Sequence, residues 1–354
     1  MSEEVQVEMR QGKRYNAENV WHWPEVSPAE LGLNTDVLDE AASVAEANKS
    51  HSLLVIHQGK LALERYWHDK TAKDVQQTYS GTKSIFSLLV GRAIEKGYLK
   101  SFEQAVRDFI PEMPEAQSQL TFRNVLAMES GMEYAPEFEA LGQTSNMKQL
   151  EIGLARKIVA KPYETYYYNN AAYRMLFTAL ERASDMSLED LTNQEIYIPL
   201  GFEGAFWVLL YAKKGGEESF TGYQSIRLTP RDFAKSAQVI LDKGMWNGER
   251  YLPESYTEDL IKAPAPDANP SFGLFHHLNG GGYIRNFAVP KQLNRKLVPD
   301  GPLDTFMMFG AMGQVVAGIP SKDLVIVRTG RGAESIYERD NYIAKLIKVI
   351  SDAV

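Results

Sequence analysis

The chain has 354 residues, with 46 acidic against 38 basic side chains and a formal net charge of −8 at pH 7. A hydrophobic fraction of 44% over this length can build a large core, so we expect one composite domain or two interlocked ones. No cluster of basic residues stands out, which argues against a nucleic-acid partner. The absence of cysteine excludes disulfides, thiolate metal ligands and cysteine catalysis.

Residues 1–30 are polar and interrupted by prolines, so we expect an N-terminal arm on the surface. They lack the charged and then apolar regions of a signal peptide, and no apolar stretch of the chain is long enough to span a bilayer. We therefore expect a cytoplasmic protein with no membrane partner. Asn34 then caps an expected helix whose apolar residues recur at helical spacing.

Two strands are predicted next, Leu53–His57 and Lys60–Trp67, because both are rich in apolar residues and are separated only by Gln58-Gly59. That dipeptide is typical of a tight hairpin turn. A strongly apolar helix follows from Ser80 to near Gly97.

Residues 101–205 read as helical and rich in loops, with helices at Leu120–Met128 and Ala171–Ala183. Strands and turns return from about residue 205. The later segments are a helix opened by Thr229 and running through Leu241, long loops over 262–302, strands Gln314–Ile319 and Leu324–Thr329, and a terminal helix with an apolar stripe from Ile343 to Ile350.

Sheet-forming segments thus lie near both ends of the chain, with helices between them. We predict a mixed α/β fold in which 31–100 and 206–354 form a domain with an antiparallel sheet flanked by helices. Residues 101–205 form a mainly helical domain inserted into it, and a site would lie in the cleft between the two.

The most informative motif is a serine and a lysine three residues apart, Ser80 and Lys83, at the start of the apolar helix. At that spacing both side chains lie on one face, one turn apart. The helix N-terminus and apolar neighbours disfavour a charged amine, and a neutral amine can take the proton of a serine. We interpret Ser80 as a nucleophile, against the simpler alternatives of a helix cap and a solvated lysine.

Other motifs carry less weight. A second Ser-x-x-Lys, Ser145 with Lys148, opens a less apolar helix, and we treat it as accidental. The chain has no G-x-S-x-G, which argues against an α/β-hydrolase. Residues 81–84 resemble the end of a phosphate-binding loop, but the glycine that should directly precede Lys83 is missing, so we reject that interpretation. The six histidines form no ligand pattern, so we expect no metal and no cofactor.

A second feature is the run from Tyr163 to Tyr173, which packs five tyrosines and two asparagines into eleven residues. A phenol beside a cation can relay protons, and an amide two residues further can hold an amine and a substrate carbonyl. Tyr168 and Asn170 fit these roles.

On these motifs the chain resembles the serine β-lactamase-like superfamily, in particular class C β-lactamase relatives, carboxylesterases and 6-aminohexanoate-dimer hydrolases. Members carry Ser-x-x-Lys, then Tyr-x-Asn, here Tyr168-Asn169-Asn170, and then a glycine-containing strand near the C-terminus. The similarity covers about residues 27–350, including Ser130-Gly131-Met132. It implies a β-lactamase/penicillin-binding-protein-like fold.

The third motif departs from the family pattern of Lys-Thr-Gly or a His-Gly. Arg328-Thr329-Gly330 matches by letters, but no strand fits between it and the terminal helix. We therefore assign the motif to Gly310–Gln314, which resembles the 6-aminohexanoate-dimer hydrolase form with Met312 in place of His. The missing basic residue weakens a β-lactamase interpretation. The backbone amides of Ser80 and Gln314, next to Gly313, are expected to form the oxyanion hole.

The resemblance implies a serine hydrolase that cleaves a small-molecule ester or amide through an acyl-serine intermediate. Ser80 would attack, Lys83 and Tyr168 would share the proton transfers, and Asn170 would orient Lys83 and the substrate. Whether Lys83 or Tyr168 is the base for Ser80 stays open at this point, as do the substrate and the oligomeric state. The alternatives are a β-lactamase or D-amino-acid peptidase, and a non-catalytic protein that binds an acyl ligand.

Overall fold

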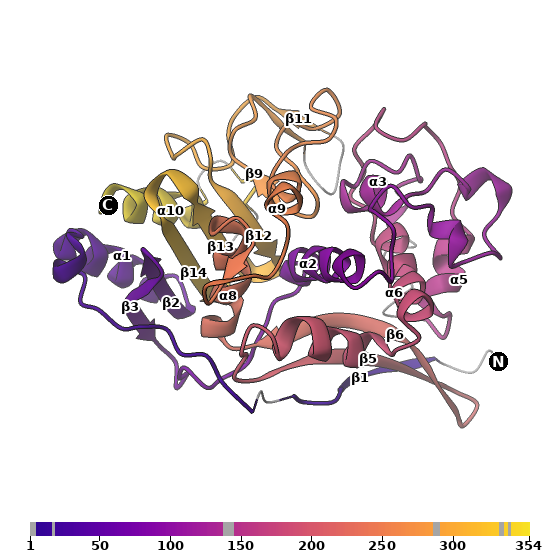
Figure 1. The fold of residues 1–354 in the computed structure, drawn as a ribbon, viewed down its shortest axis with the longest axis horizontal. Helices are drawn as coiled ribbons and strands as arrows, with labels where there is room; N and C mark the ends of the chain where they lie inside the picture. The colour runs from indigo at the N-terminus through magenta and orange to yellow at the C-terminus, as the bar shows by residue number, and fades with distance from the viewer. Residues whose placement is uncertain (1–4, 16–17, 137–144, 286–290, 333–335, 339–340) are drawn as a thin grey trace.

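The computed structural model describes residues 5–15, 18–136, 145–285, 291–332, 336–338 and 341–354. Within them the chain forms two larger antiparallel sheets and a group of helices (Figure 1). Helix α2 (Gly81–Glu95) lies at the centre, between the six-stranded sheet and the helical part. The mixed α/β class predicted from the sequence is confirmed.

The six-stranded sheet joins strands from both ends of the chain. Its order is β3 (Lys60–Tyr66), β2 (Ser50–His57), β14 (Leu324–Gly330), β13 (Gln314–Ile319), β12 (Phe306–Gly310) and β9 (His277–Leu278). Both predicted strand pairs are present. Gln58 and Gly59 have φ values of 51° and 68°, the positive values that a tight two-residue hairpin turn requires.

Helices cover both faces of this sheet, so its strands are apolar on both sides. Leu53 and Val55 of β2 pack in a cluster with α1 (Thr35–Ala47) and α10 (Tyr342–Asp352). Leu54 and Ile56 point to the other face and join the larger core around α2 and α8 (Pro230–Leu241). The period of two along a strand thus divides one continuous apolar run between two cores.

A four-stranded sheet lies beneath α2 in Figure 1. Its order is β1 (Gln6–Gln11), β5 (Ala205–Lys214), β6 (Glu217–Leu228) and β4 (Gln76–Gln77). The sequence analysis predicts neither this second sheet nor the strand in the N-terminal arm. Because β1 lies at the sheet edge and is mostly exposed, it shows little of the alternation that identifies a half-buried strand.

The remaining segments are one long helix, α6, and several short elements. The helices are α3 (Phe122–Leu126), α5 (Gln149–Leu154), α6 (Asn170–Ser184), α7 (Leu188–Thr192) and α9 (Glu254–Leu260), with a π-helical turn at Asn193–Tyr197. Single 3₁₀ turns occur at Ala29–Leu31, Val106–Asp108, Glu115–Gln117, Ala311–Gly313 and Pro320–Lys322. Short strand pairs join β7 (Met245–Trp246) with β8 (Glu249–Arg250), and β10 (Ile284–Arg285) with β11 (Gln292–Leu293).

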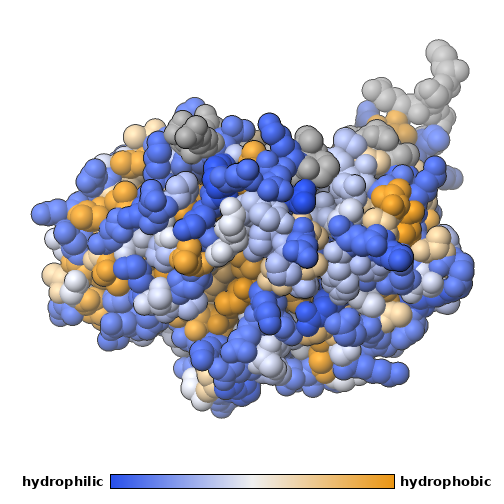
Figure 2. Space-filling model, turned by 90° about the horizontal axis from the view of Figure 1, so that it is seen from above, coloured by the Kyte–Doolittle hydropathy of each residue, from blue (hydrophilic) through white to orange (hydrophobic). Residues whose placement is uncertain are grey.

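The surface seen in Figure 2 is mainly hydrophilic, with hydrophobic residues gathered partly in a recess near the middle of the view. No helix in the described part of the chain is long and apolar enough to cross a membrane. The division at residues 100 and 205 into a sheet domain and a helical domain stays a prediction.

Candidate active site

Ser80 is the residue immediately before α2, and Lys83 lies in the first turn of that helix. The Lys83 Nζ donates to Ser80 Oγ over 3.4 Å, the long end of the hydrogen-bond range. Tyr79, just before the serine, has a φ of 48°, a left-handed conformation uncommon for a residue with a side chain. Such strained positions concentrate at functional sites.

The start of α2 is tied to the four-stranded sheet by two threonines. The Thr78 and Thr82 hydroxyls lie 2.8 Å apart, Thr78 donates to the carbonyl of Ile226 at 2.8 Å, and Thr82 accepts from the Ile226 amide at 2.9 Å. Gly81 is packed so closely that an added Cβ would lie 2.7 Å from the Phe233 ring of α8. The backbone around Ser80 is therefore fixed from two sides.

Lys83 is 6% exposed, and its amine lies between two aromatic rings. The Nζ is 4.9 Å from the ring centre of Tyr168 and 4.7 Å from that of Tyr173. Burial favours the neutral amine, whereas the two ring faces favour the ammonium. The predicted neutral state of Lys83 stays a prediction.

The two phenols that face Lys83 differ in their surroundings. Burial holds the pKa of Tyr173 well above its usual value, so this phenol stays protonated at neutral pH. Its hydroxyl makes no hydrogen bond in the described part of the protein. Tyr168 retains 9% exposure. Tyr173 lines the cavity that Ser80 lines and Tyr168 does not, so the choice of Tyr168 as the proton relay stays a prediction.

A cavity of about 190 Å³ opens beside Ser80 and Lys83. Its lining residues are Tyr79, Ser80, Thr82, Lys83, Asn170, Tyr173, Arg174, Gln224, Ser225 and Ala311. Asn169 is not among them. Its side chain accepts from the Ala172 amide at 2.9 Å and donates to the Glu133 carbonyl at 2.8 Å, so it caps α6. Asn170, the asparagine predicted for the site, is thus the one beside Ser80.

The third motif reaches the cavity through Ala311, and the oxyanion roles predicted for Gly313 and Gln314 stay predictions. Ala311 lines the cavity, whereas Gly313 and Gln314 do not, and the Gln314 side chain bonds instead to both backbone groups of Gly330. Gly310 lies so near the segment before Ser80 that an added Cβ would be 2.0 Å from the Thr78 carbonyl oxygen. This close approach brings Ala311, which the sequence analysis does not select, next to the serine.

Arg328 holds this segment from β14. Its side chain is fully buried and donates to the Met312 and Gly313 carbonyls at 2.8 and 3.0 Å. It also donates to the hydroxyl of Ser50 and to two further carbonyls. Met312 has a φ of 62° and is 51% exposed. The sequence analysis rejects Arg328 as a motif residue, and the contacts show that it supports the segment chosen instead.

The second Ser-x-x-Lys has a different structure. The Ser145 hydroxyl accepts from the Met147 amide at 3.2 Å, a local turn contact, and Lys148 is the exposed residue before α5. Lys148 lines a cavity other than that of Ser80.

No group of three or more His, Asp or Glu suited to a metal ion occurs within the described ranges. His276 and His277 are buried, and burial lowers their pKa values to about 4 and about 3. His277 accepts or donates a 3.0 Å hydrogen bond with the Tyr337 hydroxyl. Both rings therefore stay neutral parts of the core.

The sequence profile of the Beta-lactamase family matches residues 40–344. The chain belongs to the Beta-lactamase family. No curated protein matches the sequence.

Solved structures show the same fold. A protein from Bacillus anthracis assigned provisionally as a 6-aminohexanoate-dimer hydrolase has a TM-score of 0.67 and 18% identity, over 93% of this chain and 87% of that one. A β-lactamase from Mycobacterium bovis has a TM-score of 0.59 and 17% identity, over 89% and 97%. EstCE1, described as a hydrolase with promiscuous acyltransferase activity, has a TM-score of 0.63 and 15% identity, over 90% and 98%. These TM-scores, together with the family match, support the penicillin-binding-protein-like β-lactamase fold.

Proposed function

We propose that this family member is a serine hydrolase that cleaves an ester or amide bond of a small molecule through an acyl-serine intermediate. The observation that carries the proposal is the contact between Ser80 and Lys83 at the fixed start of α2, with the Tyr168 ring against the same amine. A nucleophile, a proton acceptor within reach and a second group that orients the acceptor are the parts such chemistry needs.

The reaction follows from these groups. The Ser80 Oγ bonds to the substrate carbonyl carbon while its proton passes to Lys83 or Tyr168, and the carbonyl oxygen becomes an oxyanion. Collapse of this intermediate breaks the bond to the alcohol or amine, which leaves with the transferred proton. Water then adds to the acyl-serine in the same manner and releases the acid. Asn170, which lines the cavity, orients Lys83 and the carbonyl.

Two backbone amides stabilise the oxyanion in this proposal. The first belongs to Ser80. For the second we prefer Ala311, because this residue shares the cavity with Ser80, over the Gln314 amide predicted from the sequence. One such donor is worth about 2.7–4 kcal/mol of transition-state stabilisation.

Hydrolysis of p-nitrophenyl acetate tests the proposal. We expect an initial burst or steady turnover by the wild-type protein and a loss of at least about 10³-fold in kcat for Ser80→Ala, because the remaining groups act as a unit with the nucleophile. Ser145→Ala is the matched control and should retain the activity. Wild-type protein without burst or turnover would support the non-catalytic alternative.

A β-lactamase or D-amino-acid peptidase is the second candidate, favoured by the β-lactamase of similar fold from Mycobacterium bovis. Met312 weighs against it, since a thioether offers no charge to a substrate carboxylate. Hydrolysis of nitrocefin distinguishes the two candidate functions. Turnover of nitrocefin comparable with that of p-nitrophenyl acetate would favour the β-lactamase or peptidase.

A further inference from the structure

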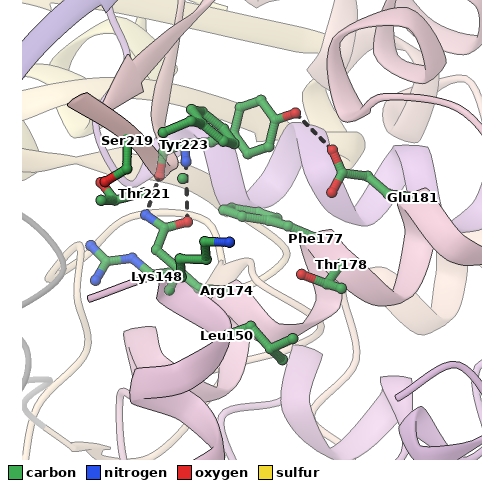
Figure 3. A pocket seen from close by; sticks show the side chains of 12 residues that line it. Lys148, Leu150, Arg174, Phe177, Thr178, Glu181, Ser219, Thr221 and Tyr223 are labelled. Atoms are coloured by element: carbon green, nitrogen blue, oxygen red, sulfur yellow. Dashed lines mark hydrogen bonds between the residues drawn. The ribbon is translucent and has the colours of Figure 1, made fainter. Parts of the chain in front are cut away.

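A second and larger cavity, of about 440 Å³, lies between α5, α6 and β6 (Figure 3). Its lining residues are Lys148, Gln149, Leu150, Arg174, Phe177, Thr178, Glu181, Ser219, Phe220, Thr221, Gly222 and Tyr223. Neither the motifs nor the proposed mechanism gives this cavity a role.

The two cavities follow one another along the contact between α6 and β6. Asn170, Tyr173 and Arg174 of α6 line the Ser80 cavity, and Arg174, Phe177, Thr178 and Glu181 line the second one. On β6, residues 224–225 line the first and residues 219–223 the second. Arg174 belongs to both linings. At the rise of an α-helix, Thr178 lies about 12 Å along α6 from Asn170.

The second cavity has a fixed framework. The Gln149 side chain is 4% exposed and binds both backbone groups of Tyr223, accepting from its amide at 3.1 Å and donating to its carbonyl at 2.7 Å. Gly222, with a φ of 146°, allows this contact, because an added Cβ would lie 2.2 Å from Gln149. The Gln149 amide thus bonds to β6 in the way that a neighbouring strand would, and it holds the β6 side of the cavity in place.

Aromatic rings form much of the lining. The ring centre of Tyr223 is 5.8 Å from that of Phe177 and 5.2 Å from that of Phe220, in edge-to-face arrangements. Leu150 adds an aliphatic group. Such a surface favours an alkyl or aryl segment of a ligand over a strongly hydrated one.

The described residues around these rings include two basic side chains and one acidic side chain. Lys148 is exposed and makes no ion pair with any residue that the structure describes, so it is the lining cation that a ligand can reach. Arg174 also lines the cavity but is 7% exposed. Among the lining residues that the structure describes, Glu181 is the one acidic side chain, and its Oε1 accepts from the Tyr223 hydroxyl at 2.7 Å and the Leu188 amide at 3.0 Å. The combination suits an anionic group at the end of an apolar segment.

We propose that this cavity is a distal substrate subsite, which takes the far end of an extended ester or amide: an alkyl or aryl segment that ends in a carboxylate. The inference rests on the proposed hydrolase function, because it assigns the cavity to the substrate of Ser80. In this arrangement the scissile carbonyl lies at Ser80, the chain runs along α6 past Arg174, and the carboxylate lies near Lys148.

Kinetics with matched esters test the subsite. One series is p-nitrophenyl monoesters of dicarboxylic acids of increasing length, each compared with its terminal methyl ester, and a second series carries the same chains on the alcohol side. We expect kcat/KM to favour the long carboxylates by up to about fivefold, the size of an exposed ion pair, in at least one series. Lys148→Gln should abolish that preference, and Lys157→Gln, an exposed lysine in neither lining, should keep it.

A steric variant provides the second arm. Thr178→Trp should lower kcat/KM for the long esters at least about tenfold and leave p-nitrophenyl acetate unchanged. Calorimetric binding of 6-phenylhexanoate to Ser80→Ala protein gives a readout without turnover, and both changes at Lys148 and Thr178 should weaken it. The subsite is refuted if binding and relative ester rates are equal in all variants. Failure of the proposed hydrolase appears separately, as absence of acetate hydrolysis in the wild type.

Discussion

The two Ser-x-x-Lys sequences of this chain share a spacing and differ in structure. Lys83 is 6% exposed and its amine contacts Ser80, whereas Lys148 is exposed and Ser145 supports a local turn. The spacing alone puts a hydroxyl and an amine on one side of the chain. Of the two pairs, the first combines burial, a fixed backbone and aromatic neighbours, and for this reason we propose it as the reactive one.

The largest expected effect comes from the amine. Lys83→Ala should reduce kcat for p-nitrophenyl acetate at least about 10³-fold, because the variant loses the proton acceptor in contact with Ser80. Lys148→Ala is the matched change in the second pair and should leave this kcat within about twofold, since its amine lies outside the Ser80 cavity. Equal losses in the two variants would remove the distinction between the pairs.

The two phenols on either side of the Lys83 amine should differ as well. Tyr168→Phe should lower kcat about 10²-fold, the lower range for one acid–base group. Tyr173→Phe removes a hydroxyl that burial keeps protonated and should change kcat far less. A larger loss for the change at Tyr173 would reverse our assignment of the relay.

Arg328 tests whether the segment beside Ser80 depends on β14. Arg328→Met should cost about 3 kcal/mol or more in the free energy of urea unfolding, because several buried carbonyls lose a charged donor. A positioning role further predicts that kcat falls while KM for the acetate ester changes little, with partial recovery in Arg328→Lys. An unchanged kcat in a folded Arg328→Met protein would show that Arg328 contributes to stability and does not position the active-site segment.

A smaller, pH-dependent effect is expected from Glu129, which precedes Ser130. Burial raises its pKa to about 8, and neither carboxylate oxygen has a partner in the described part of the chain. The folded protein therefore holds this proton more tightly than the unfolded chain, so stability falls as pH rises from about 4.5 toward 8.

Glu129→Gln should flatten this decline, and it should stabilise the protein more at pH 8.5 than at pH 5. Urea unfolding at pH 5, 7 and 8.5 measures the effect, with Glu133→Gln as a control, since Glu133 is partly exposed beside Arg156. An unchanged pH profile in Glu129→Gln would show that this carboxyl is not held in its neutral form.

Local patterns explain what the sequence could predict. The hairpin at Gln58-Gly59, the helix from Pro230 to Leu241 and the terminal helix follow from turn residues, caps and apolar periodicity, which are properties of neighbouring residues. The nearness of Tyr168 to Lys83 was predicted only through the family resemblance, because no local pattern relates two segments so far apart.

Other features depend on contacts that no local pattern encodes. Strand β1 gains its partner from β5, about two hundred residues later in sequence, and its own residues carry little signal. Ala311 enters the cavity because Gly310 passes against Thr78, and Arg328 acts across the sheet. The second cavity likewise arises from three elements that meet only in the folded protein.

Covalent labelling with a fluorophosphonate, read by intact mass and peptide mapping, tests the central claim most directly. We predict that one probe adds to the wild-type protein at Ser80, that Ser80→Ala abolishes labelling, and that Ser145→Ala labels as the wild type does. Labelling that persists in Ser80→Ala, or that maps to Ser145, would contradict the assignment of the nucleophile.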